Sequence, residues 1–457
     1  DPQVGDRDVP SEDRQLLLDA LMAAKEHLVI TFQGRDQHLN QRRPPAVPVA
    51  ELLDVVDKTV RVAAPRQSAR ELVVVQHPLQ AFDPANFTPG RLSVAAPWRF
   101  DEVYLKGANA VTETRRPRRE FLPDRLPSLL GRQFQLSSLV RFLEHPVKAF
   151  LRERLGYYAA DVPEQLSDAL PVEMGPLDRW ELGDRMLEAR LGGADLGTTL
   201  LAEQGRGLLP PGALGEGALA EVRAVVEALV AEVGSLPCGD APVTSVEVNV
   251  ALADGRSLVG TVPGVRENVV LRCTYSKLAA KHRLRAWAYF LALSASRPEL
   301  APSAVTIGQA EGSTGAKPRL STSTLGPLAG DPEVRRSAAV AALEILVDLY
   351  QRGMREPLPI YCATSAAWVA ERNRDESPIG AARTRWGSRT DDFPGESAEP
   401  EHLTVLGSAV PLEQVLERLP DDDEDGPGWD SREKSRFERL AARLWRPVLE
   451  HELLRER

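Results

Sequence analysis

The feature that most constrains the fold is a continuous pattern between residues 243 and 295. Two strand-like runs flank Asp254-Gly255, a dipeptide typical of tight hairpin turns. A third apolar run, 269–277, leads directly into 278–295, where apolar residues recur at helical spacing. The pattern predicts strands followed at once by a helix. The fold class is therefore mixed α/β or α+β.

Shorter patterns predict the remaining elements. Residues 11–34 predict a helix, capped by Ser11, that leads into a buried strand over 27–34. A helical pattern over 135–156 should be interrupted at His145-Pro146, because the residue before a proline is pushed away from helical geometry. The other expected elements are helices at 50–57, 217–233, 333–352 and 431–453, and strands at 71–76 and 303–308.

A loss of regular pattern divides the chain. Between about 77 and 130 the periodicity gives way to proline-rich segments, including "TRRPRREFLPDRLP". We expect a first domain over 1–97, a proline- and arginine-rich linker over 98–130, and a second domain over 131–457.

The net charge of −10 excludes a generally basic nucleic-acid-binding protein, so any such contact must come from local patches. One candidate is the cluster Arg115, Arg116, Arg118 and Arg119. Another is Lys277, Lys281 and Arg285, which form one stripe if a helix begins near Lys277. Phosphate binding is the functional interpretation of both sets, and a solvated surface is the alternative.

The first helix resembles the last helicase motif of superfamily-one DNA translocases. In those enzymes a Thr-Arg pair precedes Ala-(Lys/Arg), and the arginine reaches the ATP γ-phosphate; here the pair is Met22 and Ala23. Neither side chain can supply a guanidinium. The motif GxxxxGK[ST] is also absent from the sequence. We therefore expect no ATP to be bound or hydrolysed by this chain.

The strand–helix pattern at 269–295 resembles a nuclease of the PD-(D/E)xK type that has lost its acids. Such enzymes need an Asp after one strand and acid-x-Lys on the next, so that carboxylates hold Mg²⁺. Pro263 occupies the first acid position and Tyr275 the second, although Lys277 is retained. On the helix, Trp287 replaces the expected Gln and Tyr289 matches the Tyr. We expect an inactive nuclease-like domain with no catalytic residue and no metal ligand.

Other residues favour structural roles. His77 and His145 each precede a proline and should pack or cap rather than bind a metal. The acidic run 421–425 is expected to be a solvated loop. The three cysteines Cys238, Cys273 and Cys362 have no metal-like spacing and fit a reducing cytoplasm. No apolar run is long enough to span a membrane.

Several phrases together resemble the RecC family, the gamma subunits of exodeoxyribonuclease V. The more specific are "QHPLQAF" and "RFLEHPVKAF"; "PVAELLDVV", "PLDRWELGDRML" and "YQRGMREPLP" support them in the family's order. The resemblance implies the end of a degenerate helicase domain followed by an inactive nuclease-like domain. It also implies a DNA-handling subunit with RecB-like and RecD-like partners, which use ATP and Mg²⁺. The expected DNA partners are double-stranded ends and separated single strands.

Two alternatives remain at the level of the sequence. The chain is an active PD-(D/E)xK nuclease if its acids are misaligned, for example with Glu247 or Glu267 as a metal ligand. It is a protein-docking scaffold if no part of it contacts DNA.

Overall fold

The chain folds as two units, Asp1–Arg118 and Arg119–Arg457. The computed structural model describes residues 9–36, 41–63, 68–92, 95–114, 120–129, 131–158, 173–374, 376–387 and 395–457. Arg115, Arg116, Arg118 and Arg119 lie outside these described residues.

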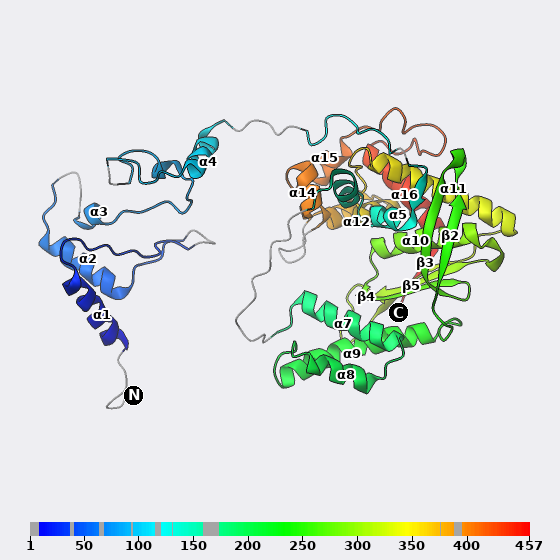
Figure 1. Cartoon of the computed structure of the whole chain (residues 1–457), viewed down its shortest axis with the longest axis horizontal. Coiled ribbons are helices and arrows are strands. Elements are labelled where there is room, and N and C mark those ends of the chain that lie inside the picture. The colour runs from blue at the N-terminus through cyan, green and yellow to red at the C-terminus, as the bar shows by residue number, and fades with distance from the viewer. Residues whose placement is uncertain are drawn as a thin grey trace. The chain divides into compact units, whose positions relative to one another are not determined.

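The first unit consists of short helices joined by extended segments (Figure 1). Its helices are α1 (Val9–Ala23), α2 (Val47–Thr59), α3 (Arg70–Val73) and α4 (Glu102–Thr112). The predicted helix at 50–57 is confirmed as part of α2. The strands predicted at 27–34 and 71–76 are wrong, because a strand requires a hydrogen-bonded neighbour. In the described part of this unit the β-type pairing is a single bridge between Arg35 and Arg42.

The second unit is built on a mixed sheet, which confirms the predicted fold class. Its described strands are β1 (Gln133–Gln135), β2 (Thr244–Ala251), β3 (Ser257–Arg266), β4 (Val269–Lys277), β5 (Ser303–Gln309), β6 (Leu320–Leu325) and β7 (Glu452–Glu456). Their order is β1-β3-β4-β5-β6-β7, with β2 also paired to β3. The β2–β3 and β3–β4 pairs are antiparallel, and β4–β5 is parallel, with helix α10 (Ala280–Ser296) as the crossover.

Helices cover both faces of this sheet. On one face lie α7 (Pro176–Leu191) and α9 (Ala213–Gly234), which pack on β4; Figure 1 shows them in green beside α8 (Leu196–Gly205). On the other face α10 packs against α5 (Leu136–Glu144) and α11 (Pro332–Gly353). The remaining helices are α6 (Pro146–Ala149), the π-helix Phe150–Arg154, α12 (Cys362–Arg372), α13 (Ile379–Trp386), α14 (Pro400–Leu406), α15 (Leu412–Leu416) and α16 (Arg436–His451).

The two faces form two separate apolar clusters. The larger contains the fully buried rings of Phe142, Phe290 and Trp445, contributed by α5, α10 and α16. The smaller joins Met186 of α7 to Tyr275 of β4, together with residues of α9 and β5. The sheet is therefore covered on both sides, as the long apolar runs of β4 and β5 indicate.

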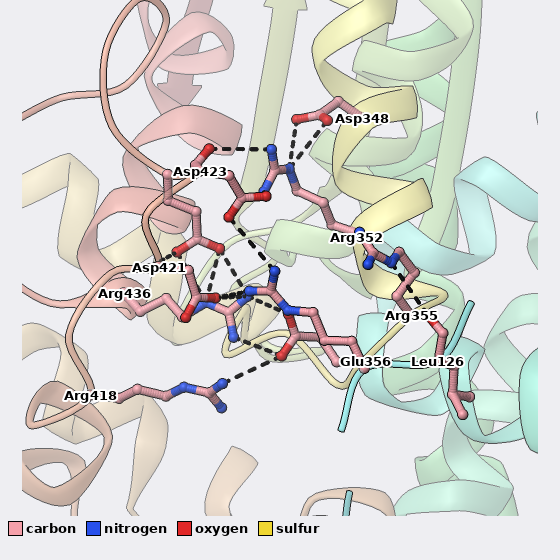
Figure 2. A network of polar contacts seen from close by, with 11 residues as sticks. Leu126, Asp348, Arg352, Arg355, Glu356, Arg418, Asp421, Asp423 and Arg436 are labelled. Atoms are coloured by element: carbon pink, nitrogen blue, oxygen red, sulfur yellow. Dashed lines mark hydrogen bonds and ion pairs between the residues drawn. The ribbon is translucent and has the colours of Figure 1, made fainter. Parts of the chain in front are cut away.

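The acidic run 421–425 is a loop, as the sequence predicted, but only part of it is solvated: Asp422, Asp423 and Asp425 are exposed, whereas Glu424 is buried. Arg436 of α16 is fully buried, and its guanidinium contacts Glu356, Asp421 and Glu424 at 2.6–2.8 Å. Figure 2 shows this network, in which Arg352 also reaches Asp423 at 2.8 Å. Burial raises the pKa of Glu356, but hydrogen bonds and charge from Arg436 outweigh it, and the net shift is downward. The acidic residues therefore neutralise arginines of the same unit.

Most local predictions in the second unit hold. The helices over 213–234 and 332–353 and the break at His145-Pro146 are confirmed. The terminal helix covers Arg436–His451 rather than 431–453. It ends early because Glu452–Glu456 pair with β6. Helices α4 and α7 were not predicted. Among the described residues, no helix combines the length and apolar character needed to cross a membrane.

Candidate functional site

The region that resembles a nuclease centres on a fork between β3 and β4. These two strands pair only at Val265–Val270 and Arg266–Val269. The same edge of β3 pairs with β1 at residues 257–259, while β2 occupies the opposite edge. On this edge of β3, residues 260–264 therefore lie between the part that pairs with β1 and the part that pairs with β4, and they pair with neither strand. Pro263 lies in this gap and has no N–H to donate to a neighbouring strand.

A cavity of about 80 Å³ lies in the fork. Its lining comes from three strands and one helix: Pro263 and Gly264 of β3, Val270, Leu271 and Arg272 of β4, Thr306 of β5, and Arg285, Ala286 and Tyr289 of α10. In the nuclease interpretation, the acid positions should lie beside Pro263 and face the helix. The lining of the cavity shows which residues lie around Pro263.

Tyr275, the residue expected at the second acid position, lies away from this cavity. The β4 residues that share the cavity with Pro263 are Val270, Leu271 and Arg272, of which only Arg272 is charged, whereas Tyr275 is not among the lining residues. Tyr275 is buried against α7, and its ring lies where a Cβ on Gly183 would be. Burial raises the pKa of Tyr275 to about 12, so its hydroxyl is neutral. Successive side chains of β4 point to opposite faces of the sheet, but the sequence alone does not show which of the two faces is covered by α10.

The two helical positions lie in different surroundings. Tyr289 lines the cavity together with Arg285, which lies one turn earlier on α10, whereas Trp287 does not line it. Trp287 is 2% exposed and packs in the larger cluster near Phe290 and His451. Of the degenerate nuclease positions named from the sequence, Pro263 and Tyr289 line this cavity.

The basic stripe is only partly formed. Lys277 is the last residue of β4, not part of a helix, and its exposed ammonium lies 3.3 Å from Glu311. Lys281 and Arg285 both lie on α10, four residues apart. Lys281 is exposed, while Arg285 is an ion-pair partner of Glu144 on α5. Lys277 and Arg285 are therefore partly neutralised.

Two polar groups near the cavity have no hydrogen-bond partner among the described residues. Thr306 is 1% exposed, and its Oγ1 is unpaired. His282, three residues before Arg285 on α10, is 6% exposed, and neither ring nitrogen has a partner. Burial, with the charges of Lys281, Arg272 and Arg285, lowers the pKa of His282 to about 4. Sequence reasoning missed Arg272, His282 and Thr306 because their grouping depends on the β4–β5 register.

The two helicase-like positions, Met22 and Ala23, lack side chains that could bind a nucleotide phosphate. Met22 and Ala23 end α1, and Met22 is 79% exposed. Neither side chain can contact a phosphate through a charge-assisted hydrogen bond. The expectation of no ATP binding therefore rests on the chemistry of these residues.

Outside the fork, the described residues contain two groups of His or acidic side chains close enough to share an ion. One is Asp421, Asp423 and Glu424, which arginines neutralise. The other is His145, Glu399 and His402. His145 Nδ1 accepts the N–H of Lys148, so the proton of the neutral ring is on Nε2, 2.9 Å from Glu399. His145 therefore caps α6, as expected, and its Nε2 offers no lone pair to a metal.

The sequence of this chain is similar to that of proteins of a known family. The RecC C-terminal domain family matches residues 131–373. The RecBCD enzyme subunit RecC of Mycobacterium tuberculosis (strain ATCC 25618 / H37Rv) is 40% identical over 450 residues, covering 98% of this chain and 39% of that protein. The same subunit of Mycolicibacterium smegmatis is 38% identical over 454 residues, covering 99% and 39%. That of Escherichia coli (strain K12) is 26% identical over 406 residues, covering 84% and 33%.

The chain belongs to the RecC family and contains its C-terminal domain, which confirms the resemblance found in the sequence. It spans about two fifths of the length of the mycobacterial relatives.

Proposed function

We propose that this chain forms part of a RecC-type subunit that handles DNA and carries no nuclease or helicase chemistry of its own. The observation that carries the proposal is the fork, where Pro263 and Arg272 face one cavity. A proline has no ligand atom, and a guanidinium repels a divalent cation. Mg²⁺ requires oxygen ligands, of which at least one is usually a carboxylate.

The partners follow from the family. Relatives named as subunits of the RecBCD enzyme support assembly with RecB-like and RecD-like proteins. ATP and Mg²⁺ would then be used by those partners, and this chain would contact double-stranded ends and separated strands. We expect the complex to work in the cytoplasm, in the repair of double-strand breaks by recombination.

The active-nuclease alternative has little support. Glu247 lies on β2, paired with Thr261 of β3, and is exposed. Glu267 lies in the turn between β3 and β4 at a positive φ of 56°. Neither lines the cavity that contains Pro263 and Tyr289. The pure docking-scaffold alternative differs from our proposal only in DNA contact.

A cleavage assay separates the first two functions. The full chain is incubated with linear DNA and Mg²⁺ or Mn²⁺, with and without Glu247→Gln and Glu267→Gln. We expect no cleavage above the level of a metal-free reaction. Metal-dependent cleavage that either substitution abolishes would establish the nuclease instead.

A crosslinking experiment tests the DNA contact. The chain is assembled with RecB-like and RecD-like subunits on forked DNA that contains photoreactive bases. We expect adducts on residues 119–457. A complex that forms without any adduct on this chain would favour the docking scaffold.

A further inference from the structure

The cavity in the β3–β4 fork has an excess of positive charge. Arg272 is exposed, and no described acidic side chain lies within ion-pair distance of its guanidinium. Desolvation and the charge of Arg285 lower the pKa of Arg272, and these two effects outweigh the opposing influence of Glu144, Tyr289 and Asp184. Glu144, one of the acids that act on Arg272, already accepts a hydrogen bond from Arg285.

The wall of the cavity also offers a hydrogen-bond donor. Arg272 and Thr306 are direct neighbours in the parallel β4–β5 register, so both side chains project to the face covered by α10. The Thr306 hydroxyl is buried without a partner, and a buried polar group in this state is costly unless something binds it. The cavity thus combines an unneutralised guanidinium with an unused hydroxyl.

We propose that this cavity binds one phosphate of a nucleic-acid backbone, which deepens the strand-handling function proposed above. A planar guanidinium matches two phosphate oxygens, and the Thr306 hydroxyl supplies a further donor. In an active nuclease of this fold the carboxylates and their metal would hold the phosphate; here Arg272 supplies the positive charge directly. Lys281 adds an exposed cation on α10, the helix that also contributes Arg285 to the cavity wall. A second cation near the cavity favours a polyanion over a single carboxylate as the ligand.

The test uses the full chain and a fluorescent oligothymidine, with binding measured by anisotropy over a range of salt concentrations. Arg272→Gln removes the charge, and Thr306→Val removes only the hydroxyl. Arg336→Gln is the matched control, because Arg336 is an exposed arginine on α11 that does not line the cavity.

We expect Arg272→Gln to weaken binding by about tenfold, and to reduce the slope of log affinity against log salt by about 0.7, the value of one single-strand phosphate. Thr306→Val should weaken binding by a few-fold, and Arg336→Gln should match the wild type. Arg272→Lys retains the positive charge but not the planar guanidinium with its paired donors. The affinity of this variant should therefore fall between that of the wild type and that of Arg272→Gln. Far-UV circular dichroism checks that each variant is folded.

Failure of this proposal can be distinguished from failure of the proposed function. If the chain binds the oligonucleotide and Arg272→Gln binds it equally well, the cavity proposal is overturned and the DNA-handling function stands. In a second arm, inorganic phosphate is titrated while the His282 ring signals are followed by NMR. If phosphate shifts these signals only when Arg272 is present, but no oligonucleotide binds, the assignment to a nucleic-acid strand is overturned.

Discussion

The two units of this chain differ in how much of their sequence they bury. In the second unit, the sheet and its helices enclose two apolar clusters that include several fully buried aromatic rings. In the described part of the first unit, the buried residues are Ala69, Asn86, Leu92 and Ala108. Large apolar side chains of α1 and α2, such as Leu16, Met22 and Val55, are instead exposed. Both units have helices, but among the described residues only those of the second unit enclose an apolar core.

This difference shows that an amphipathic pattern and a buried face are separate properties. A helix can form from local periodicity, whereas its stability in water comes mainly from packing of the apolar face. Exposed apolar surface of this extent marks a site of interaction with other protein. We therefore expect the first unit to depend on contacts that it does not make by itself.

The largest expected effect concerns the two units when they are separated. A fragment covering residues 119–457 should unfold cooperatively, while residues 1–118 should show weak helicity without a thermal transition. Circular dichroism and amide hydrogen exchange measure both. Protected amides and a sharp transition in the shorter fragment would remove the distinction between the units.

The next largest effect is expected at the buried charge network of the second unit. Arg436→Met leaves Glu356, Asp421 and Glu424 without their shared cation, and we expect a loss of about 3–5 kcal/mol in the free energy of unfolding. Arg418→Met is the matched control: Arg418 contacts Glu356 at 3.4 Å but is 50% exposed, so about 1 kcal/mol or less is expected. Urea denaturation gives both values. Equal losses in the two variants would mean that burial does not set the energy of this network.

A smaller effect tests the packing of α7 on the sheet. A Cβ at Gly183 would lie 2.3 Å from the ring of Tyr275, so Gly183→Ala should cost about 1–3 kcal/mol. Gly217→Ala on the exposed side of α9 meets no atom within 4 Å and should stabilise the helix by up to about 1 kcal/mol. Thermal unfolding of the full chain measures the two changes. A Gly183→Ala variant as stable as the wild type would show that α7 moves freely on β4.

The smallest effect is the pH dependence that two buried histidines add to the second unit. Burial lowers the pKa of both His282 and His402 to about 4. Because both values lie below that of an unfolded histidine, about 6.5, the unfolded state binds protons first as the pH falls. Each histidine should therefore lower the stability of the folded state by about 1 kcal/mol as the pH falls from 6.5 to 5.5. NMR titration of the ring protons gives the pKa values, and a midpoint near 6.5 would contradict this prediction.

Residues 243–353 show what the sequence determined by itself. The hairpin turn, the crossover helix and the long helix α11 follow from local periodicity and turn chemistry, which are short-range properties. The absence of a carboxylate at Pro263 is equally a property of the sequence. Family membership also followed from short phrases, without any knowledge of the fold.

Tertiary structure decided the rest, because each remaining feature depends on partners distant in the sequence. Glu452–Glu456 form a strand rather than a helix because β6 offers an edge, and Arg283 of α10 pairs with Glu452. Residues 27–34 have strand-like composition but no strand beside them in the described part of their unit. The register of β4 against β5 and α10 placed Arg272, and not Tyr275, beside Pro263. A one-residue shift in a strand reverses the face of every side chain, and the pattern of a strand buried on both faces cannot fix that choice.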